Sequence, residues 1–277
     1  MIRSCLSHHP SLSPPNRVKR PRNHDWRYIV GPQATELIRW LPLLRVAKQV
    51  VAERMAALAN DKPLKMDMLG SFLAHGLTRD EAEGETLVQI IAGSDTTATA
   101  MRATLLHLLS NPTAYAALTH EVRTAAREGR ISSPVTDAES RAKLPYLQAV
   151  VREGLRVWPP VAGLMSVTVP PGGDIIHGLQ IPEGTEIGWA AYGVLHDAAV
   201  FGPDAAVFRP ERWLDADPER LKAMLAQADF VFKYGKWQCL GKTIAQIELN
   251  KIFVEVRTSF GAMTLWCLMV ALIDYND

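Results

Sequence analysis

Residues 232–241 are the stretch whose residue types and spacing could do chemistry, because they place Cys239 between Gly235 and Gly241. A segment with helical apolar periodicity follows at once, so Cys239 should lie at or just before a helix N-terminus. Unsatisfied backbone N–H groups and the positive end of the helix dipole favour a thiolate over a thiol there. Such a thiolate could serve as a nucleophile or as a metal ligand.

Taken alone, this stretch also fits a buried structural cysteine between two turn glycines, which is the commoner case. It resembles, however, the cysteine-ligand loop of the cytochrome P450 family, whose pattern is Phe-x-x-Gly-x-Arg-x-Cys-x-Gly. Phe232, Gly235, Cys239 and Gly241 match this pattern, whereas Trp237 stands where the family has Arg. The resemblance implies haem as the cofactor, with Cys239 as the axial thiolate ligand of its iron. The indole N–H of Trp237 could still donate a hydrogen bond to a haem propionate.

A second motif, residues 92–97, lies in the middle of a long predicted helix and reads Ala-Gly-Ser-Asp-Thr-Thr. A helix should avoid it, because an interior Gly costs about 1 kcal/mol relative to Ala and the polar residues compete for backbone hydrogen bonds. Two explanations are open, a close helix crossing at Gly93 or a groove that Gly93 opens for a small ligand. In the resembled family this motif forms the oxygen pocket. That implies that Ala92 and Gly93 line the pocket and that Asp95 and Thr96 deliver protons during oxygen activation.

A third motif joins two distant segments. Glu153 and Arg156 are three residues apart and so share a helix face, where such a pair is usually a solvated bridge worth about 0 to 1 kcal/mol. Here the pair resembles the family's Glu-x-x-Arg signature, and residues 208–213 resemble its Pro-Glu-Arg-Phe segment. The resemblance implies a structural cluster of Glu153, Arg156 and Arg212 that locks the core. Guanidiniums can hold one carboxylate bidentately, so Lys would not substitute.

Two further groups are weaker candidates. Val161, Ala162 and Gly163 resemble the family segment that lines the substrate pocket, although an ordinary buried turn fits any one of them nearly as well. His196 and Asp197 could suggest a catalytic dyad, but the sequence shows no nucleophile elbow to go with them. We therefore interpret these two as turn residues.

The elements that must position these motifs are mostly helical, which predicts a mainly α fold with a small β portion, as in the cytochrome P450 fold. A capping box formed by Thr78 and Glu81 opens a helix of about thirty residues that ends at Asn111. Other helices are expected at residues 34–59, 66–74, 112–129 and 145–157, and after Cys239. A polar loop is expected at residues 130–144, and short strands of one small sheet at 167–169, 175–176 and 185–191.

Composition narrows the classes of partner. Thirty basic and twenty-nine acidic residues leave a net charge of +1, which argues against a nucleic-acid partner. Three cysteines without a Cys-x-x-Cys pair argue against a disulfide framework and against a structural zinc site, and they suit a reducing compartment. The N-terminus has no apolar run typical of a signal peptide or membrane anchor. Family analogy suggests the endoplasmic reticulum membrane, but no residue pattern in the sequence identifies the compartment.

The motifs divide the chain into three parts. Residues 1–33 are expected to be a disordered, basic and Pro-rich tail, and residues 34–256 the C-terminal portion of a cytochrome P450 domain. Residues 257–277 are expected to be an apolar tail outside the family. Its apolar run from Phe260 to Ile273 is too short for an ordinary membrane span. The fold is therefore expected to be incomplete at the N-terminus and at the C-terminus.

The resemblance implies a haem-thiolate monooxygenase that inserts one oxygen atom from O2 into an apolar organic substrate. An NAD(P)H-dependent reductase would supply the electrons. The motif sequences look most like those of fungal family members that act in secondary metabolism or oxidise aromatic compounds. One alternative is a truncated, inactive or regulatory fragment with weak or no haem binding. Another is a haem enzyme that rearranges peroxides, against which Asp95 and Thr96 argue, because that pair serves oxygen activation.

Overall fold

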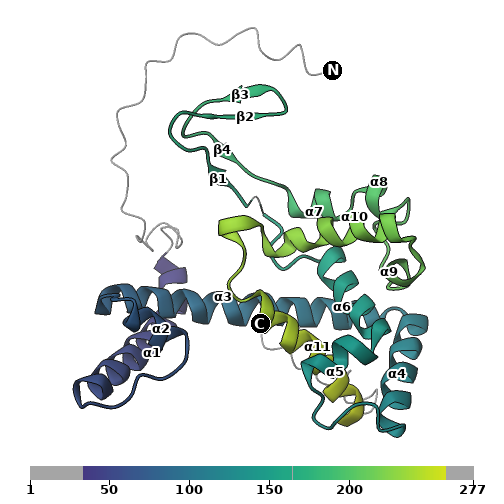
Figure 1. Cartoon of the computed structure of the whole chain (residues 1–277), viewed down its shortest axis with the longest axis horizontal. Coiled ribbons are helices and arrows are strands. Elements are labelled where there is room, and N and C mark those ends of the chain that lie inside the picture. The colour runs from purple at the N-terminus through teal and green to yellow at the C-terminus, as the bar shows by residue number, and fades with distance from the viewer. Residues whose placement is uncertain (1–33, 164, 260–277) are drawn as a thin grey trace. The chain divides into compact units, whose positions relative to one another are not determined.

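The computed structural model describes residues 34–163 and 165–259. By its internal contacts the chain divides into two compact units, residues 1–91 and residues 92–277. Both units are built mainly from helices, and strands occur in short pairs (Figure 1). The mainly α fold with a small β portion is therefore confirmed.

Two of the expected segments fall outside the described residues. These are the basic, Pro-rich tail at residues 1–33 and the apolar run from Phe260 to Ile273. Among the residues that are described, no helix combines the length and the apolar character needed to cross a bilayer.

Unit 1 contains two helices and the first turns of a third, and capping residues fix where they begin. Asp67 accepts the backbone N–H of Gly70 (2.8 Å) and also binds both terminal nitrogens of Arg54 (2.8 and 2.7 Å). Thr78 forms the predicted capping box, donating its N–H and its hydroxyl to the Glu81 carboxylate (2.9 and 2.8 Å). The helices are α1 (Ala34–Ala59), α2 (Met68–Ala74) and α3 (Arg79–Leu109), which continues into unit 2.

Unit 2 holds the second part of α3 and all three sequence motifs. Turns and loops join its helices, the strands lie in the long connection at residues 158–190, and two 3₁₀ turns, η2 and η3, lie just before the last helix. The elements are α4 (Pro112–Arg127), α5 (Asp137–Lys143), α6 (Pro145–Val157), α7 (Ala191–Leu195), α8 (Ala198–Phe201), α9 (Arg212–Asp215), α10 (Pro218–Ala228), η2 (Asp229–Phe232), η3 (Gly235–Trp237) and α11 (Lys242–Ser259).

Helix α6 is the central element of unit 2, and ten of its thirteen residues are buried. With α3, α4 and α11 it forms the larger apolar core, in which Leu118, Leu147 and Leu249 are at most 1% exposed. With α8, α9 and α10 it forms a second, smaller core around Phe201 and Trp213. Because α6 belongs to both cores, residues on it can link the two halves of the unit.

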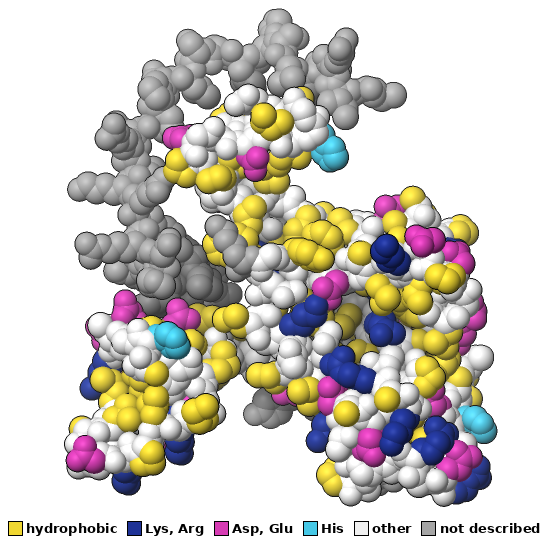
Figure 2. All heavy atoms as spheres, viewed as in Figure 1, with side chains coloured by type: hydrophobic (Ala, Val, Ile, Leu, Met, Phe, Trp, Pro, Cys, Tyr) yellow, Lys and Arg dark blue, Asp and Glu magenta, His cyan; other side chains and the backbone are white. Residues whose placement is uncertain are grey.

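Helix α4 begins as the sequence predicts. The side-chain oxygen of Asn111 accepts the backbone N–H of Ala114 (3.1 Å), and Pro112 occupies the first turn. Charged side chains of both signs cover the outer surface around α4, α5 and α11 (Figure 2). The apolar faces of these helices are consequently turned to the core and their charged faces to the solvent.

The close helix crossing lies at a different glycine from the one considered. A Cβ added to Gly93 would meet no atom within 4 Å, so the crossing explanation for that residue is wrong. At Gly154 a Cβ would lie 2.0 Å from the hydroxyl oxygen of Thr104. Helix α6 therefore approaches α3 at Gly154, where any larger side chain would push the two helices apart.

The polar loop expected at residues 130–144 is wrong, because this region contains α5. A capping box opens the helix, with the Thr136 side chain accepting the backbone N–H of Glu139 (3.3 Å) and the Glu139 carboxylate accepting the Thr136 N–H (3.1 Å). Arg141 and Lys143 stand in its last turn, where cations are favourable. The Thr-x-x-Glu spacing was the signal in the sequence that could have identified α5.

The β portion consists of two separate antiparallel pairs, whereas one small sheet was expected. In the first pair Val167 lies opposite Ile187, and in the second Ile175 lies opposite Gln180. His177 and Gly178 both have positive φ angles (50° and 78°), as the tight turn of a two-residue hairpin requires. The strands are β1 (Val167–Thr168), β2 (Asp174–Ile176), β3 (Leu179–Ile181) and β4 (Glu186–Ile187).

Two details of the strand prediction were wrong. Strand β3 was not expected, because its three residues are too few to show an alternating pattern. The segment expected at residues 185–191 is extended only as far as Ile187, and Ala191 already begins α7. Pairing with β1 rather than local sequence therefore sets the end of β4.

Candidate functional site

The loop that carries Cys239 lies between η2 and α11. Cys239 comes three residues before Lys242, the first residue of α11. Its backbone N–H donates to the carbonyl oxygen of Phe232 (2.8 Å), which closes the loop on itself. Lys233 and Gly235 have positive φ angles (58° and 59°), so the chain reverses sharply between the two bonded residues.

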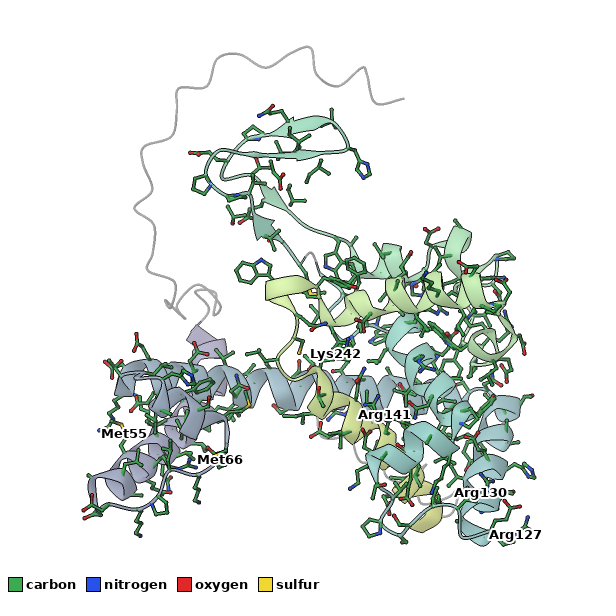
Figure 3. The ribbon with its side chains drawn as sticks, in the orientation of Figure 1. Met55, Met66, Arg127, Arg130, Arg141 and Lys242 are labelled. Atoms are coloured by element: carbon green, nitrogen blue, oxygen red, sulfur yellow. The ribbon has the colours of Figure 1, made fainter. Side chains whose placement is uncertain are left out.

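An ion pair joins the two ends of this loop. Lys242 donates to both carboxylate oxygens of Asp229 (2.6 and 2.7 Å), which links the start of α11 to the start of η2. The same ammonium lies 5.6 Å from the centre of the Phe232 ring. Figure 3 shows Lys242 at the end of α11 nearest the loop. The loop is thus held at both ends by side chains as well as by its internal backbone bond.

Cys239 is a free and exposed thiol. Large apolar side chains around it are exposed as well, and their exposed fractions are far above those of the core residues. These are Tyr234 (61%), Trp237 (57%), Leu240 (80%) and Ile244 (52%). The buried part of α11 lies further along, at Leu249, Phe253 and Val254. The apolar face predicted after Cys239 is therefore divided, with its first turns exposed beside the thiol and its later turns in the core.

Glycines keep the surroundings of the thiol open. A Cβ added to Gly241 would meet only the sulfur of Cys239, at 3.8 Å, and one added to Gly235 would meet nothing within 4 Å. Aromatic rings stand next to the loop: Phe230 lies with its ring centre 5.5 Å from that of Tyr234 and 5.4 Å from that of Trp189. A flat apolar group could therefore approach the sulfur and be flanked by aromatic side chains.

The motif at residues 92–97 lies within α3 and does not interrupt the helix. The hydroxyl of Thr96 donates to the carbonyl oxygen of Ala92 (2.7 Å), so the helix itself accommodates this polar side chain. Ala92, Gly93 and Asp95 are exposed, and Thr96 is half-buried. The structure thus leaves the Asp95 carboxylate and the space beside Gly93 accessible.

A groove of about 480 Å³ runs between α3 and α11. Both helices line it with residues at the same spacing, which is that of one helix face. The lining residues are Gly93, Ser94, Thr97, Ala98 and Met101 of α3 and Ile247, Glu248, Lys251, Ile252 and Glu255 of α11. Gly93, Ser94 and Thr97 are the members of the sequence motif that line this groove, whereas Asp95 and Thr96 do not line it.

The structure brings Glu153, Arg156 and Arg212 together. The Glu153 carboxylate accepts two nitrogens of Arg156 (2.7 and 2.9 Å) and the Nε of Arg212 (2.9 Å). It also accepts the backbone N–H of Arg209 (2.9 Å) and the indole N–H of Trp213 (2.9 Å). The carboxylate is fully buried, so two cations and two further donors are needed to compensate its desolvation.

Both guanidiniums also bind backbone carbonyl oxygens of the segment between α7 and α9. Arg156 donates to Leu195 (2.8 Å) and Ala205 (2.6 Å), and Arg212 donates to Phe201 (2.6 Å). Burial raises the pKa of the neighbouring Asp204, but hydrogen bonds from Arg209 and Arg212 lower that pKa by more, so it lies below its usual value. The cluster therefore fastens an irregular segment to α6.

The remaining candidates lie in loops. Val161, Ala162 and Gly163 are exposed after the end of α6, so they are not the buried turn that was the alternative interpretation. His196 ends α7, and its ring stacks on Tyr192 with 3.9 Å between ring centres. Asp197 caps α8 by accepting the N–H of Ala199 (2.9 Å). Both residues are thus placed as turn residues.

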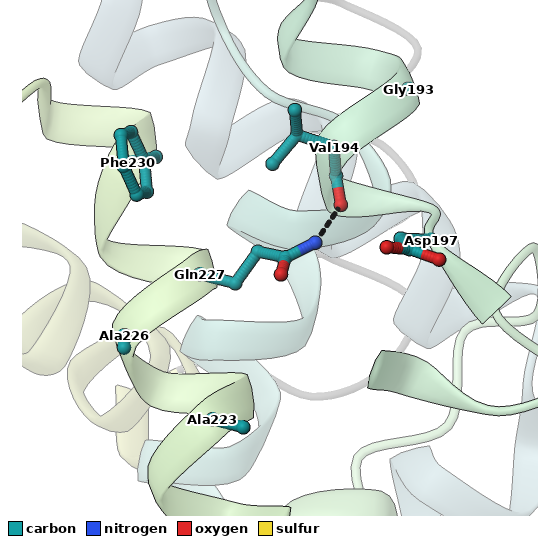
Figure 4. A pocket seen from close by; sticks show the side chains of 7 residues that line it. All are labelled: Gly193, Val194, Asp197, Ala223, Ala226, Gln227 and Phe230. Atoms are coloured by element: carbon teal, nitrogen blue, oxygen red, sulfur yellow. Dashed lines mark hydrogen bonds between the residues drawn. The ribbon is translucent and has the colours of Figure 1, made fainter. Parts of the chain in front are cut away.

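A hollow of about 570 Å³ between α7 and α10 was not foreseen from the sequence. Figure 4 shows Gln227 crossing its floor, where its side-chain nitrogen donates to the carbonyl oxygen of Val194 (2.6 Å). Small residues make the hollow, Gly193 from α7 and Ala223 and Ala226 from α10. Ala223 and Ala226 share one face of α10, but the sequence does not show that Gly193 of α7 lies opposite them.

The model of the family Cytochrome P450 matches residues 23–261 of the chain. The chain belongs to the cytochrome P450 family. The matched range includes the three motifs and extends beyond both ends of residues 34–256, the range expected to be the cytochrome P450 portion. Cytochrome P450 is a haem-binding family, so haem is the cofactor of the chain.

Fungal cytochrome P450 proteins are among the curated relatives. The "Cytochrome P450 monooxygenase ABA1" of Pyricularia oryzae is 48% identical over 218 residues, which are 79% of this chain and 42% of the relative. The "Cytochrome P450 monooxygenase aba1" of Botryotinia fuckeliana is 40% identical over 237 residues, 86% of this chain and 46% of the relative. "Pisatin demethylase" of Fusarium vanettenii is 34% identical over 225 residues, 78% of this chain and 42% of the relative. The chain thus spans less than half the length of these relatives.

The residues of this cytochrome P450 chain fit haem. The group requires a soft axial ligand and apolar surroundings, and the exposed Cys239 thiol among exposed Tyr234, Trp237 and Leu240 offers both. Exposed apolar side chains of this size are costly to leave in water, and a flat apolar ligand would cover them. The donor set departs from the family at Trp237, where an indole N–H replaces a guanidinium.

Proposed function

We propose that this cytochrome P450 is a haem-thiolate monooxygenase that inserts one atom of O2 into an apolar organic substrate. An NAD(P)H-dependent reductase supplies the electrons, and the second oxygen atom leaves as water. The observation that carries the proposal is the exposed Cys239 thiol, closed into its loop by the 2.8 Å bond to Phe232 and framed by apolar side chains. Haem bound there supplies the redox chemistry of oxygen activation.

The protein's own residues then have distinct tasks. The Cys239 thiolate would hold the haem iron and donate electron density to it, and the carbonyl oxygen of Phe232 accepts the Cys239 backbone N–H. Gly235 and Gly241 leave room beside the sulfur. Trp237 offers one N–H to an anionic group at the edge of the cofactor. The ion pair of Lys242 with Asp229 joins the two ends of this loop.

Asp95 and Thr96 are proposed to handle protons. The exposed carboxylate of Asp95 can exchange protons with solvent, and the Thr96 hydroxyl can pass one on. In the structure that hydroxyl donates to the Ala92 carbonyl oxygen, so it must turn away from the helix to donate elsewhere. Gly93 and Ala92 add no bulk there, which leaves space for a molecule as small as O2.

The substrate class is proposed from the lining and from the relatives. Val161, Ala162 and Gly163 present small and apolar side chains without a charge, so an uncharged organic molecule suits them. The relatives carry the names of fungal monooxygenases and of a pisatin demethylase. A small apolar molecule of secondary metabolism is therefore the proposed substrate.

The carbon monoxide difference spectrum of the reduced, haem-supplemented protein tests the ligation. A Soret band shifted strongly to the red indicates a thiolate ligand, and it should be absent from Cys239→Ala. Cys5→Ala and Cys267→Ala are matched controls that should keep the band. A wild-type spectrum typical of histidine ligation, or no band at all, would overturn the proposal.

A further inference from the structure

Trp213 gives the buried Glu153 carboxylate a donor that the family pattern does not contain. The Pro-Glu-Arg-Phe pattern ends in Phe, which has no N–H, whereas this chain has Trp at the corresponding position. In the structure the indole nitrogen of Trp213 lies 2.9 Å from the Oε2 atom of Glu153. Trp213 is 3% exposed, so no water can take over this bond.

The two oxygens of Glu153 depend on Trp213 to different degrees. Oε1 accepts three donors, from Arg156, Arg212 and the backbone of Arg209. Oε2 accepts only two in the described structure, the Nε of Arg156 (2.9 Å) and the indole of Trp213. Loss of the indole N–H would leave a fully buried carboxylate oxygen with a single donor, which is unfavourable in a low dielectric.

The ring of Trp213 leads from this cluster towards the cysteine loop. It packs in the smaller core with Phe201 of α8 and Met224 of α10, and its ring centre lies 6.1 Å from that of Phe201 in an edge contact. Helix α10 runs without a break into η2. The last residue of η2 is Phe232, whose carbonyl oxygen accepts the Cys239 N–H. One path of side-chain contacts and backbone therefore joins Glu153 to the backbone N–H of Cys239.

We propose that Trp213 is a positioning residue for the cysteine loop. Its N–H fixes the orientation of the indole against Glu153, the indole supports α10, and α10 carries η2 and the carbonyl oxygen that closes the loop at Cys239. The role of Trp213 in presenting a thiolate to haem rests on the proposed function. The mechanical coupling of the indole to the loop is independent of that function, and it can be measured without the cofactor.

Two substitutions separate the N–H of Trp213 from its bulk. Trp213→Phe keeps an aromatic ring and removes the donor. Trp213→His removes the second ring but keeps a donor, because the Nε2 of His occupies the same place in the five-membered ring as the indole nitrogen. Hydrogen–deuterium exchange of the full-length, haem-free chain then reports on the amides of α10, η2 and Cys239.

Exchange of the Cys239 amide and of α10 should be about tenfold faster in Trp213→Phe, since one hydrogen bond to a buried carboxylate is lost. Exchange in α4, which contains no residue of the smaller core, should not change. Trp213→His should retain most of the protection of the loop. The proposal is overturned if Trp213→Phe leaves the loop unchanged, if it accelerates α4 equally, or if Trp213→His loses as much protection as Trp213→Phe.

The reduced carbon monoxide spectrum adds a second readout on the haem-supplemented proteins. Trp213→Phe should show a larger share of a band without thiolate character than wild type, well below its unfolding temperature. A wild type without any thiolate band would refute the proposed function, while the exchange result would still decide the coupling. A normal thiolate band in Trp213→Phe together with unchanged exchange would refute the role of Trp213 alone.

Discussion

Trp237 stands where the family pattern has Arg, and 57% of it is exposed beside Cys239. An indole offers one neutral donor to a haem propionate, whereas a guanidinium offers charged and bidentate ones. Trp237→Arg should therefore slow the dissociation of haem by about 5- to 30-fold, equivalent to about 1 to 2 kcal/mol. Transfer of haem to an excess of apomyoglobin measures this rate. Trp158→Arg, at another exposed Trp, should leave it unchanged, and equal rates in wild type and Trp237→Arg would show that Trp237 does not face the cofactor.

Arg156 shows why the buried cluster needs the planar fork of Arg. Its guanidinium binds Glu153 twice and reaches the carbonyl oxygens of Leu195 and Ala205, which the single nitrogen of Lys cannot do together. Arg156→Lys should lower the free energy of unfolding by about 3 kcal/mol. Urea denaturation measures the loss. Arg209→Lys is the control, because that side chain is 38% exposed and its change should cost less than about 1 kcal/mol; similar costs would contradict a special role for Arg156.

At the scale of residues, the sequence predicted which side chains meet but not all of their partners. The spacing of Glu153 and Arg156 places them on one helix face, and the resemblance adds Arg212. The carbonyl oxygens that the Arg side chains bind lie at the ends of two short helices and in the loop after them, where no periodic pattern predicts the contacts. The donor at Trp213 was visible as a residue type, but its direction depends on packing in the smaller core.

The start of helix α6 is stabilised by a side chain from another helix. Its N-terminal neighbour Leu144 has no capping side chain, and the carboxylate of Glu121 on α4 accepts the N–H groups of Tyr146 (2.8 Å) and Leu147 (2.9 Å) instead. Burial raises the pKa of Glu121, and these two bonds oppose the rise only in part. The helix that carries Glu153 is therefore capped from a distance of more than twenty residues along the chain.

This raised pKa predicts a pH dependence with a definite sign. The folded state binds the Glu121 proton more tightly than the unfolded state, so the associated stability is fully present below the unfolded pKa, near 4.3, and is lost as the pH rises through the folded pKa. Glu121→Gln does not titrate. The free energy of unfolding of wild type should therefore fall relative to that of Glu121→Gln as the pH rises from about 4 to 7. Urea denaturation across this range measures the difference, and parallel curves for the two proteins would contradict the prediction.

At the scale of elements, start signals were predictable and contacts between elements were not. Thr78 and Asn111 open α3 and α4 as their side-chain chemistry predicts, and Thr136 could have identified α5 in the same way. Gly93 and Gly154 look alike in a sequence. Whether either lies at a close crossing depends on the helix opposite, and only the structure shows Thr104 against Gly154.

At the scale of the whole molecule, the motifs lie in one compact unit although they are spread over about half of the chain. Residues 92–277 hold the cysteine loop, the α3 motif and the Glu153 cluster, and α6 links the two cores of this unit. The sequence predicted the helical class and the order of the motifs. It could not predict the two separate strand pairs, because strands of two or three residues carry too little pattern and depend on pairing.

This organisation predicts where haem should stabilise the protein. A ligand present at 100 times its Kd adds about 2.7 kcal/mol, and for a chain of this size each kcal/mol raises Tm by about 2 to 4 °C, so a rise of roughly 5 to 10 °C is expected. Calorimetry of the full chain with and without haem measures the shift, and Cys239→Ala should reduce it.

Hydrogen exchange should slow at η2, the cysteine loop and the start of α11, because these segments surround the ligand. The amides of α1 and α2 should be unaffected, since they belong to the other unit. Equal slowing in both units would mean that haem acts on the chain as a whole rather than through the Cys239 loop.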